Sequence, residues 1–200
     1  MNDALEQDDD RAQELALVRA LSQGERGAFD KLYALHHERI WSFLLRLTGR
    51  KDEAEDLFQE TWLSAAKAAS QLEAESRLLP WLFTIARNKH RSARRFLLFD
   101  LRKRALHALE PLPEAQDAEA RVLGAEEAEA LQRAFYALPD ASREVLLLSL
   151  EGFDAPHIAG VLGLREDAVR KRLSRARTEL RTMMESQAAD PRAMRTRKSS

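Results

Sequence analysis

Basic side chains that could bind nucleic-acid phosphates concentrate in one stretch of this 200-residue sequence. Between Ile85 and Arg104 there are eight cationic residues and a single acid, Asp100, which gives a local net charge of +7. The formal net charge of the whole chain is only -1, so its charges are segregated along the sequence. Since nucleic-acid binding depends on local fields, this stretch predicts contact with a phosphate backbone.

Five side chains in this stretch are candidate contacts for single-stranded DNA. A helix beginning near Pro80 would place them on two flanks beside an apolar face. Asparagine can form paired hydrogen bonds with a base, whereas arginine attracts the phosphate backbone. The preceding loop, residues 70–79, could help to form the pocket that an unstacked base requires. The candidates are Asn88, Arg91 and Arg95 on one flank, and Arg87 and Arg94 on the other.

Trp81, at the start of the same helix, has two possible roles. Its ring could stack on DNA bases. Its helical spacing with Leu82 and Ile85 is more typical of a core residue, and we therefore expect Trp81 to be buried.

A second constellation, near the C-terminus, has the helix-turn-helix pattern. It consists of a short helix from Pro156 to Leu162, a turn at Gly163, and a longer helix from Glu166 to Met184. A solvated basic helix in a plain bundle would explain the charges but not the turn. Packing of the two helices would leave one face of the second free for the DNA major groove. The residues expected to reach phosphates and base edges are Arg170, Lys171, Ser174 and Arg175, with Arg170 and Lys171 as the base readers.

A third group forms a polar, mainly acidic strip on a predicted helix. Asp56, Gln59, Glu60 and Leu63 stand at positions i, i+3, i+4 and i+7, so they share one helix face. Such a strip suits a partner helix that carries basic residues. Composition alone favours an ordinary solvated face, so the strip by itself does not decide between the two interpretations.

The elements that must position these groups are helices. Apolar residues recur at helical spacing, and no segment shows the sustained alternation of a half-buried strand. The sequence therefore predicts an all-α fold of two small helical domains joined by a flexible acidic linker. Gly49 should end the second helix, and Asp52 should cap the third. The predicted helices cover residues 13–21, 26–47, 53–69, 80–97, 125–137, 141–150, 156–162 and 166–184.

Charge and proline content divide the chain further. Two prolines and several acids between Glu110 and Asp117 leave little to bury, which is typical of a linker. The last residues are basic and are expected to be disordered. The expected divisions are an acidic tail (1–12), a first domain (13–106), a linker (107–124), a helix-turn-helix domain (125–186) and a basic tail (187–200).

Several function classes are excluded by the residues that the chain lacks. Without cysteine there are no disulfides, thiolate zinc sites or cysteine nucleophiles. The five histidines are scattered, and the adjacent His36 and His37 would point about 100 degrees apart on a helix, so they form no ligand pair. No glycine-rich phosphate loop or nucleophile motif appears. We therefore expect no catalysis, metal or cofactor.

The N-terminus and the hydropathy pattern bear on location. The first ten residues are acidic, and they lack the positive start and apolar core of a signal peptide. No later apolar run approaches the roughly 20 residues that span a bilayer. We therefore expect a cytoplasmic protein without membrane insertion.

Motifs in register across residues 15–181 resemble a known family. Four motifs are similar to conserved region two of the extracytoplasmic-function sigma factors of bacterial RNA polymerase, and four later ones are similar to their region four. The first four are Ala28–Tyr33, Arg46–Gly49, Ala54–Trp62 and Trp81–Asn88. The others are Leu138–Pro139, Arg143–Val145, Glu151–Gly152 and the helix-turn-helix that ends at Ser174–Arg177.

The resemblance implies partners and a role for each surface. It implies that the strip with Asp56, Gln59 and Glu60 docks on the clamp helices of the largest polymerase subunit. The basic fourth helix would melt and hold the non-template strand of the minus-ten promoter element. The helix-turn-helix would bind the minus-thirty-five duplex, and the acidic linker would run toward the RNA exit channel. Further implied partners are the polymerase flap region and an anti-sigma factor.

Two segments depart from the family pattern, and two other functions stay open. Pro156–His157 and Arg165–Ala168 differ from the usual residues, which leaves the capping of the recognition helix and its phosphate contacts undecided. A stand-alone dimeric helix-turn-helix regulator would bind duplex DNA tightly at a palindromic site without polymerase. A helical adaptor would bind only proteins. Neither the regulator nor the adaptor would require the second basic face, which contains Asn88.

Overall fold

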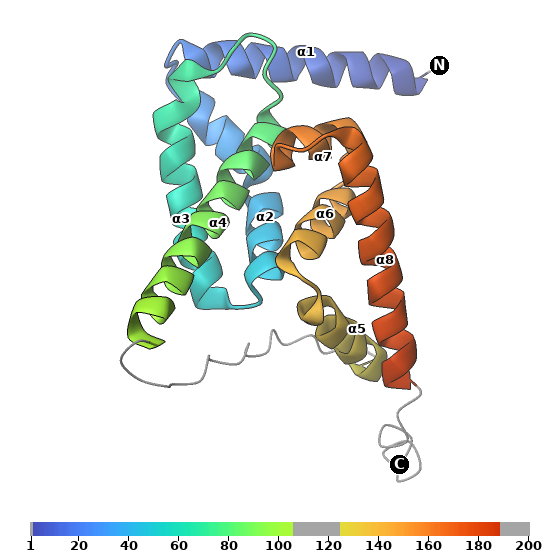
Figure 1. Ribbon diagram of the computed structural model, residues 1–200. Helices are drawn as coiled ribbons and strands as arrows, with labels where there is room; N and C mark the ends of the chain where they lie inside the picture. The colour runs from blue at the N-terminus through green and yellow to red at the C-terminus, as the bar shows by residue number, and fades with distance from the viewer. Residues whose placement is uncertain (1, 106–124, 189–200) are drawn as a thin grey trace. The chain divides into compact units, whose positions relative to one another are not determined.

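The computed structural model describes residues 2–105 and 125–188 (Figure 1). These residues form eight α-helices and one short 3-10 helix, and no strand occurs among them. The predicted all-α fold is thereby confirmed. The chain divides into two compact units, Met1–Ala115 and Gln116–Ser200. The predicted linker and all but the first two residues of the predicted basic tail lie outside the described residues.

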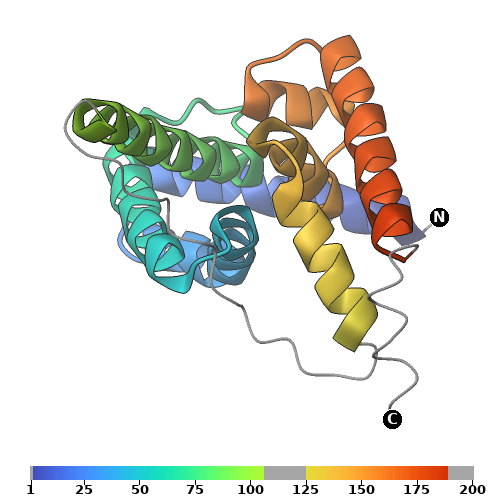
Figure 2. The ribbon, with the colours of Figure 1, turned by 60° about the horizontal axis from the view of Figure 1, so that its bottom comes forward.

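The first unit is built on three mutually packed helices, α2, α3 and α4, with α1 against α2 (Figure 2). The short helix η1 follows α3 directly and also contacts α1. Because α4 packs against both α2 and α3, one of its faces is buried and the other is left for solvent. The elements are α1 (Asn2–Ser22), α2 (Ala28–Thr48), α3 (Lys51–Ala68), η1 (Ala69–Gln71) and α4 (Leu78–Ala105).

Aromatic and aliphatic side chains at helical spacing make the core of this unit. Phe43 on α2 and Phe83 on α4 are fully buried, with ring centroids 4.8 Å apart and ring planes at 68°. Such edge-to-face pairs are favourable beyond the area they bury. A second aromatic group links α2 to α3, since Tyr33 contacts both Phe58 and Trp62. These contacts fix the face that α3 turns toward solvent.

The turn between α2 and α3 confirms one of the two predictions made for it and contradicts the other. Gly49 ends α2 in the left-handed conformation, φ 73°, and its N–H donates to the Leu45 carbonyl over 2.9 Å. The predicted cap at Asp52 is wrong. Arg50 is the residue before α3, and Asp52 lies in the first turn, where its carboxylate binds the Arg50 guanidinium at 2.6 Å.

Two helices are longer than periodicity predicted. The helix expected at residues 13–21 begins at Asn2, in the stretch expected to be a tail, and the helix expected to end near Leu97 continues to Ala105. Both extensions are rich in charged residues, which make a poor apolar stripe but are acceptable helix formers. The apolar pattern therefore predicted only part of the length of each helix.

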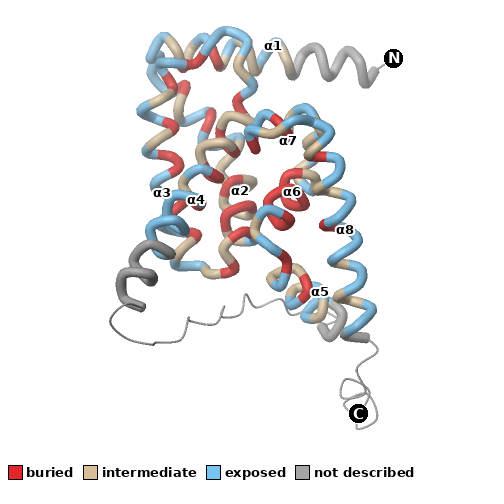
Figure 3. The backbone as a smooth tube through the Cα atoms, in the orientation of Figure 1, coloured by how far each residue is buried: buried red, intermediate tan, exposed pale blue. Residues whose placement is uncertain are grey.

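The second unit is organised around α8, which packs against α5, α6 and α7. Figure 3 shows an almost unbroken run of buried residues along α6, and every residue from Ser142 to Leu148 is buried. Because α6 is covered on several sides, its apolar residues do not form a single stripe. The helices are α5 (Ala125–Ala137), α6 (Asp140–Leu150), α7 (Ala155–Leu162) and α8 (Glu166–Ala188), close to the predicted bounds.

Candidate protein- and nucleic-acid-binding surfaces

The polar strip lies on the solvent face of α3. Its four residues, Asp56, Gln59, Glu60 and Leu63, are all exposed. Leu63 has 62% of its surface exposed, although it is apolar. Single exposed apolar residues are common on protein surfaces, so the exposure of Leu63 shows only that this face of α3 is accessible. The opposite face of α3 is buried through Ala54, Leu57, Thr61, Trp62 and Ala65.

One ion pair joins this strip to the basic helix beside it. The Lys89 ammonium on α4 lies 3.5 Å from the Glu60 carboxylate, and both side chains are partly exposed. Surface pairs of this kind contribute little stability. Glu60 therefore stands at the border between the acidic strip and the basic face of α4.

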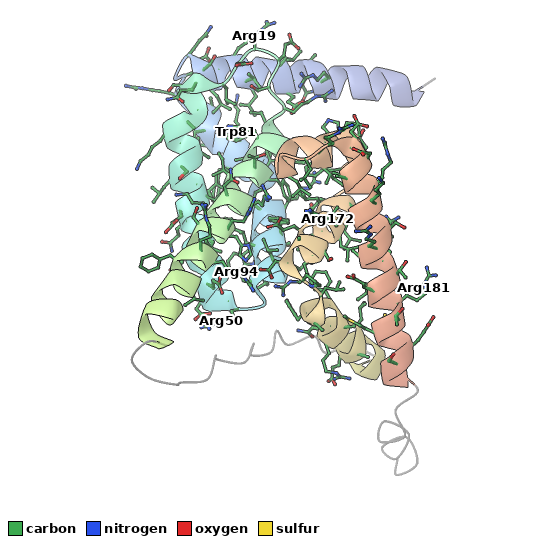
Figure 4. All side chains as sticks on the ribbon, in the orientation of Figure 1. Arg19, Arg50, Trp81, Arg94, Arg172 and Arg181 are labelled. Atoms are coloured by element: carbon green, nitrogen blue, oxygen red, sulfur yellow. The ribbon has the colours of Figure 1, made fainter. Side chains whose placement is uncertain are left out.

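Four of the five candidate DNA contacts on α4 share a solvent-facing surface. Asn88, Arg91, Arg94 and Arg95 are exposed, and Arg94 is labelled in Figure 4. Arg87 is the exception, because only 7% of it is exposed. It follows Phe83 by four residues, which places both on the buried side of the helix. We correct the sequence-based assignment accordingly: Arg87 does not belong to the exposed basic face.

Three further residues of α4 differ from expectation. Trp81, expected in the core and labelled at the start of the helix in Figure 4, is only partly buried, and so is Ile85. His90, which the sequence did not single out, is 2% exposed. It stands seven residues after Phe83, on the same helix face, so helical spacing could have identified it. The buried face of α4 thus includes two polar side chains, Arg87 and His90.

The helix-turn-helix of the second unit has the predicted geometry. Gly163 adopts the left-handed conformation, φ 63°, at the end of α7, and the N–H of Leu164 donates to the Ala159 carbonyl over 3.0 Å. Ile158 and Val169 are buried between the two helices. A positive φ at the turn is easily adopted by glycine, which explains the residue type at this position.

The outward face of α8 contains all four candidate contacts for duplex DNA. Arg170, Lys171, Ser174 and Arg175 are exposed, while Val169 and Ala176 on the other side of the helix are completely buried. The Arg170 guanidinium lies 3.3 Å from the Glu166 carboxylate one turn earlier. Both side chains are exposed, so this pair contributes little stability.

Asp154 caps the N-terminus of α7, the first helix of the motif. Its carboxylate accepts the backbone N–H of His157 over 3.0 Å and lies 2.6 Å from the ring Nδ1 of the same residue. Pro156 then occupies the first turn of α7, where a missing N–H does no harm. The short first helix of the motif is therefore capped by a side chain at its start and by Gly163 at its end.

Acid should weaken this cap. The backbone N–H of His157, and then its ring, hold the pKa of Asp154 below its ordinary value. A depressed pKa means that the stabilisation is complete above the ordinary aspartate range, about 3.9, and is lost as pH falls below it. We expect the thermal stability of the second unit to fall in this range and to fall less in Asp154→Asn, which caps without titrating. Identical pH profiles for the two proteins would contradict the contribution of Asp154.

Other site types find no support in the described part of the chain. Residues 2–105 and 125–188 contain no group of three or more histidine or acidic side chains placed to hold a metal ion. Among the same residues, no helix has both the length and the apolar character needed to cross a bilayer.

Comparison with known proteins identifies both units. The family model of Sigma-70 region 2 matches residues 32–97, and that of Sigma-70, region 4 matches residues 128–180. The ECF RNA polymerase sigma factor SigM of Mycobacterium tuberculosis is 32% identical over 170 residues, which cover 84% of this chain and 83% of SigM. RNA polymerase sigma factor NccH of Alcaligenes xylosoxydans is 32% identical over 180 residues, 86% of this chain and 94% of NccH.

A solved structure agrees with these sequence matches. The chain resembles the sigma factor RpoE of Bartonella quintana, crystallised in complex with the anti-sigma factor NepR, with a TM-score of 0.66 and 25% identity. The match covers 80% of this chain and 98% of that one. With two region matches in order and curated relatives covered over most of their length, this chain belongs to the extracytoplasmic-function sigma factors of RNA polymerase.

Proposed function

We propose that this sigma factor works in the cytoplasm, without catalysis of its own, through three surfaces. The strip on α3, residues Asp56, Gln59, Glu60 and Leu63, docks on the clamp helices of the largest polymerase subunit. The exposed face of α4 holds the melted minus-ten element, and the exposed face of α8 binds the minus-thirty-five duplex. Residues 13–106 and 125–186 are the two functional domains.

The observation that carries this proposal is the position of the recognition face on α8. Four residues that could contact DNA are exposed there, and the buried residues of the same helix hold it against three others. A helix anchored on one side with cations on the other can enter the major groove without unfolding its domain.

The surface on α4 supports a different kind of DNA contact. Asn88 can form paired hydrogen bonds with a base, and Arg91, Arg94 and Arg95 can neutralise a phosphate backbone around it. Trp81, partly exposed at the start of the helix, adds an aromatic face near the preceding loop. A duplex-only regulator would not require this second surface, which favours the sigma factor over a dimeric regulator.

An anti-sigma factor is a further proposed partner. The similar RpoE was crystallised with the anti-sigma factor NepR. A protein inhibitor of this chain would block initiation most directly by covering the strip on α3, where Leu63 supplies exposed apolar surface. Polymerase and inhibitor would then compete for one surface.

In vitro transcription on pooled genomic fragments tests the proposal. Purified core polymerase should start new transcripts only when this chain is added, and their start sites should share a two-element motif. An absence of new transcripts, together with specific binding of the chain alone to a palindromic duplex, would instead indicate a stand-alone regulator.

Replacing Gln59 and Glu60 together with alanine should weaken binding to core polymerase. We expect roughly a tenfold loss, because two polar contacts near the centre of the strip are removed. Surface plasmon resonance with immobilised core polymerase measures the change, and circular dichroism checks the fold. Glu38→Ala, which removes an exposed carboxylate from α2, is the matched control and should bind normally. Equal affinities for all three proteins would contradict docking through this strip.

A further inference from the structure

Helix α1 is tied to the segment that precedes α4 by two side chains that lie three residues apart. The Arg11 guanidinium donates to the backbone carbonyl of Glu75 over 3.2 Å and to that of Ser76 over 3.5 Å. The Glu14 carboxylate accepts the backbone N–H of Leu78 over 2.8 Å. Both side chains are only 21% exposed, so these contacts are partly shielded from water.

The contact with Leu78 supplies a cap that α4 does not have in its own sequence. Arg77 stands at the capping position, since its carbonyl accepts the N–H of Trp81 over 3.1 Å. An arginine side chain has no acceptor and cannot cap the N–H groups of the first turn. The Glu14 carboxylate, 64 residues earlier in the chain, does so instead. Its negative charge also suits the positive end of the helix dipole.

Arg11 and Glu14 also form an ion pair with each other. The second oxygen of Glu14 lies 2.5 Å from the Arg11 guanidinium and 3.6 Å from that of Arg77. Arg11 in turn lies 3.7 Å from the Glu75 carboxylate. The backbone from Glu75 to Leu78 is therefore held by one connected network. Four residues of this network border an open cavity of about 1290 Å³ between α1, α2 and the start of α4, namely Arg11, Glu14, Arg77 and Leu78.

We propose that Glu14 and Arg11 are positioning residues for single-stranded promoter DNA. They hold residues 75–78, and with them the first turn of α4, in the conformation that receives the unstacked bases of the minus-ten element. Neither side chain touches DNA. The inference rests on the proposed minus-ten role of α4 and its preceding loop, and it assigns a function to α1 that the motifs did not suggest.

Electrostatics alone and the positioning role predict opposite effects of removing Glu14 on DNA binding, which makes the inference testable. Removing a carboxylate near a DNA-binding surface should strengthen binding to a polyanion. If Glu14 instead positions the loop, its removal should weaken binding. Glu14→Gln and Glu14→Ala both remove the charge, but only glutamine keeps an oxygen that can accept the Leu78 N–H. The difference between the two variants isolates the hydrogen bond.

The experiment uses full-length chain bound to core polymerase. The probe is a fluorescent oligonucleotide with the non-template minus-ten strand of a promoter found by in vitro transcription. We expect Glu14→Ala to bind about five- to tenfold more weakly than wild type, as the loss of a helix cap implies. Glu14→Gln should stay close to wild type, and Glu38→Ala should be unchanged. Hydrogen exchange should show faster exchange of the Leu78 amide only in Glu14→Ala.

The other possible outcomes contradict either the positioning role of Glu14 and Arg11 or the minus-ten function of α4. Wild-type affinity in Glu14→Ala, or equal losses in the alanine and glutamine variants, would overturn the positioning role. If Glu14→Ala does not fold, Arg11→Gln replaces it, and wild-type affinity there would overturn the role equally. A wild-type holoenzyme that does not bind the oligonucleotide would overturn the minus-ten function itself. The affinity of each variant for core polymerase should stay normal. A loss of oligonucleotide binding then reflects the position of the loop and not weaker docking on polymerase.

Discussion

Changing Arg170, Lys171 and Arg175 together to alanine should lower the affinity of the holoenzyme for a minus-thirty-five duplex by about two to three orders of magnitude. Contacts from cations to phosphates or base edges are each worth roughly 1 kcal/mol or more, and three are removed together. All three side chains are exposed on α8, so their removal leaves the buried residues of the helix intact. Fluorescence anisotropy with a labelled duplex measures the loss.

The salt dependence of binding distinguishes phosphate contacts from base contacts. Each lost phosphate contact should reduce the slope of log affinity against log salt by about 0.9. Arg170→Ala alone should cost about 1 to 3 kcal/mol if it reads a base, and it should relax the promoter preference. Arg181→Ala removes an exposed cation farther along α8 and is the matched control. An unchanged slope and affinity in the triple variant would exclude α8 as the duplex-binding element.

Replacing Phe43 with alanine should destabilise the first unit by about 3 to 5 kcal/mol. The side chain is completely buried against Phe83, so the substitution removes apolar contacts and leaves a cavity among α2, α3 and α4. A loss of this size is a large part of the stability of a small domain. Because α3 and α4 carry the proposed polymerase and minus-ten surfaces, both binding functions should fail at elevated temperature together.

Calorimetry of the full chain tests this expectation. The transition of the first unit should move to lower temperature, while that of the second unit, which has its own core, should stay in place. Leu35→Ala on the same helix is the matched control, since Leu35 is 63% exposed and should change stability by less than about 0.5 kcal/mol. A single shared transition, shifted as a whole, would show that the two units unfold together.

The sequence was sufficient wherever function depends on one helix and its immediate turn. Along α8, apolar residues at helical spacing identified the buried face, which includes Val169 and Ala176, and so left Arg170 and Arg175 on the exposed side. Gly49 and Gly163 were recognisable as helix ends because few other residues accept a positive φ. These features are local, and a few neighbouring residues determine them.

Features that depend on partners distant in the chain needed the tertiary structure. Arg87 looked like its neighbour Asn88 as a possible DNA contact, yet in the folded chain only 7% of it is exposed. Asp52 is a different case, because its partner is local: it had the right residue type for a cap, but Arg50, two residues earlier, binds its carboxylate in the first turn of α3. In both cases residue type was a good guide to chemistry and a poor guide to position.

The all-α fold, the family membership and the basic face of the recognition helix were therefore determined by the sequence alone, because periodicity and motif spacing are properties of short segments. The tertiary structure decided which charged residues face solvent and that Glu14 of α1 caps α4. No periodic pattern connects residues 64 positions apart, and only the packing of α1 against α2 and η1 brings that carboxylate to the first turn of α4.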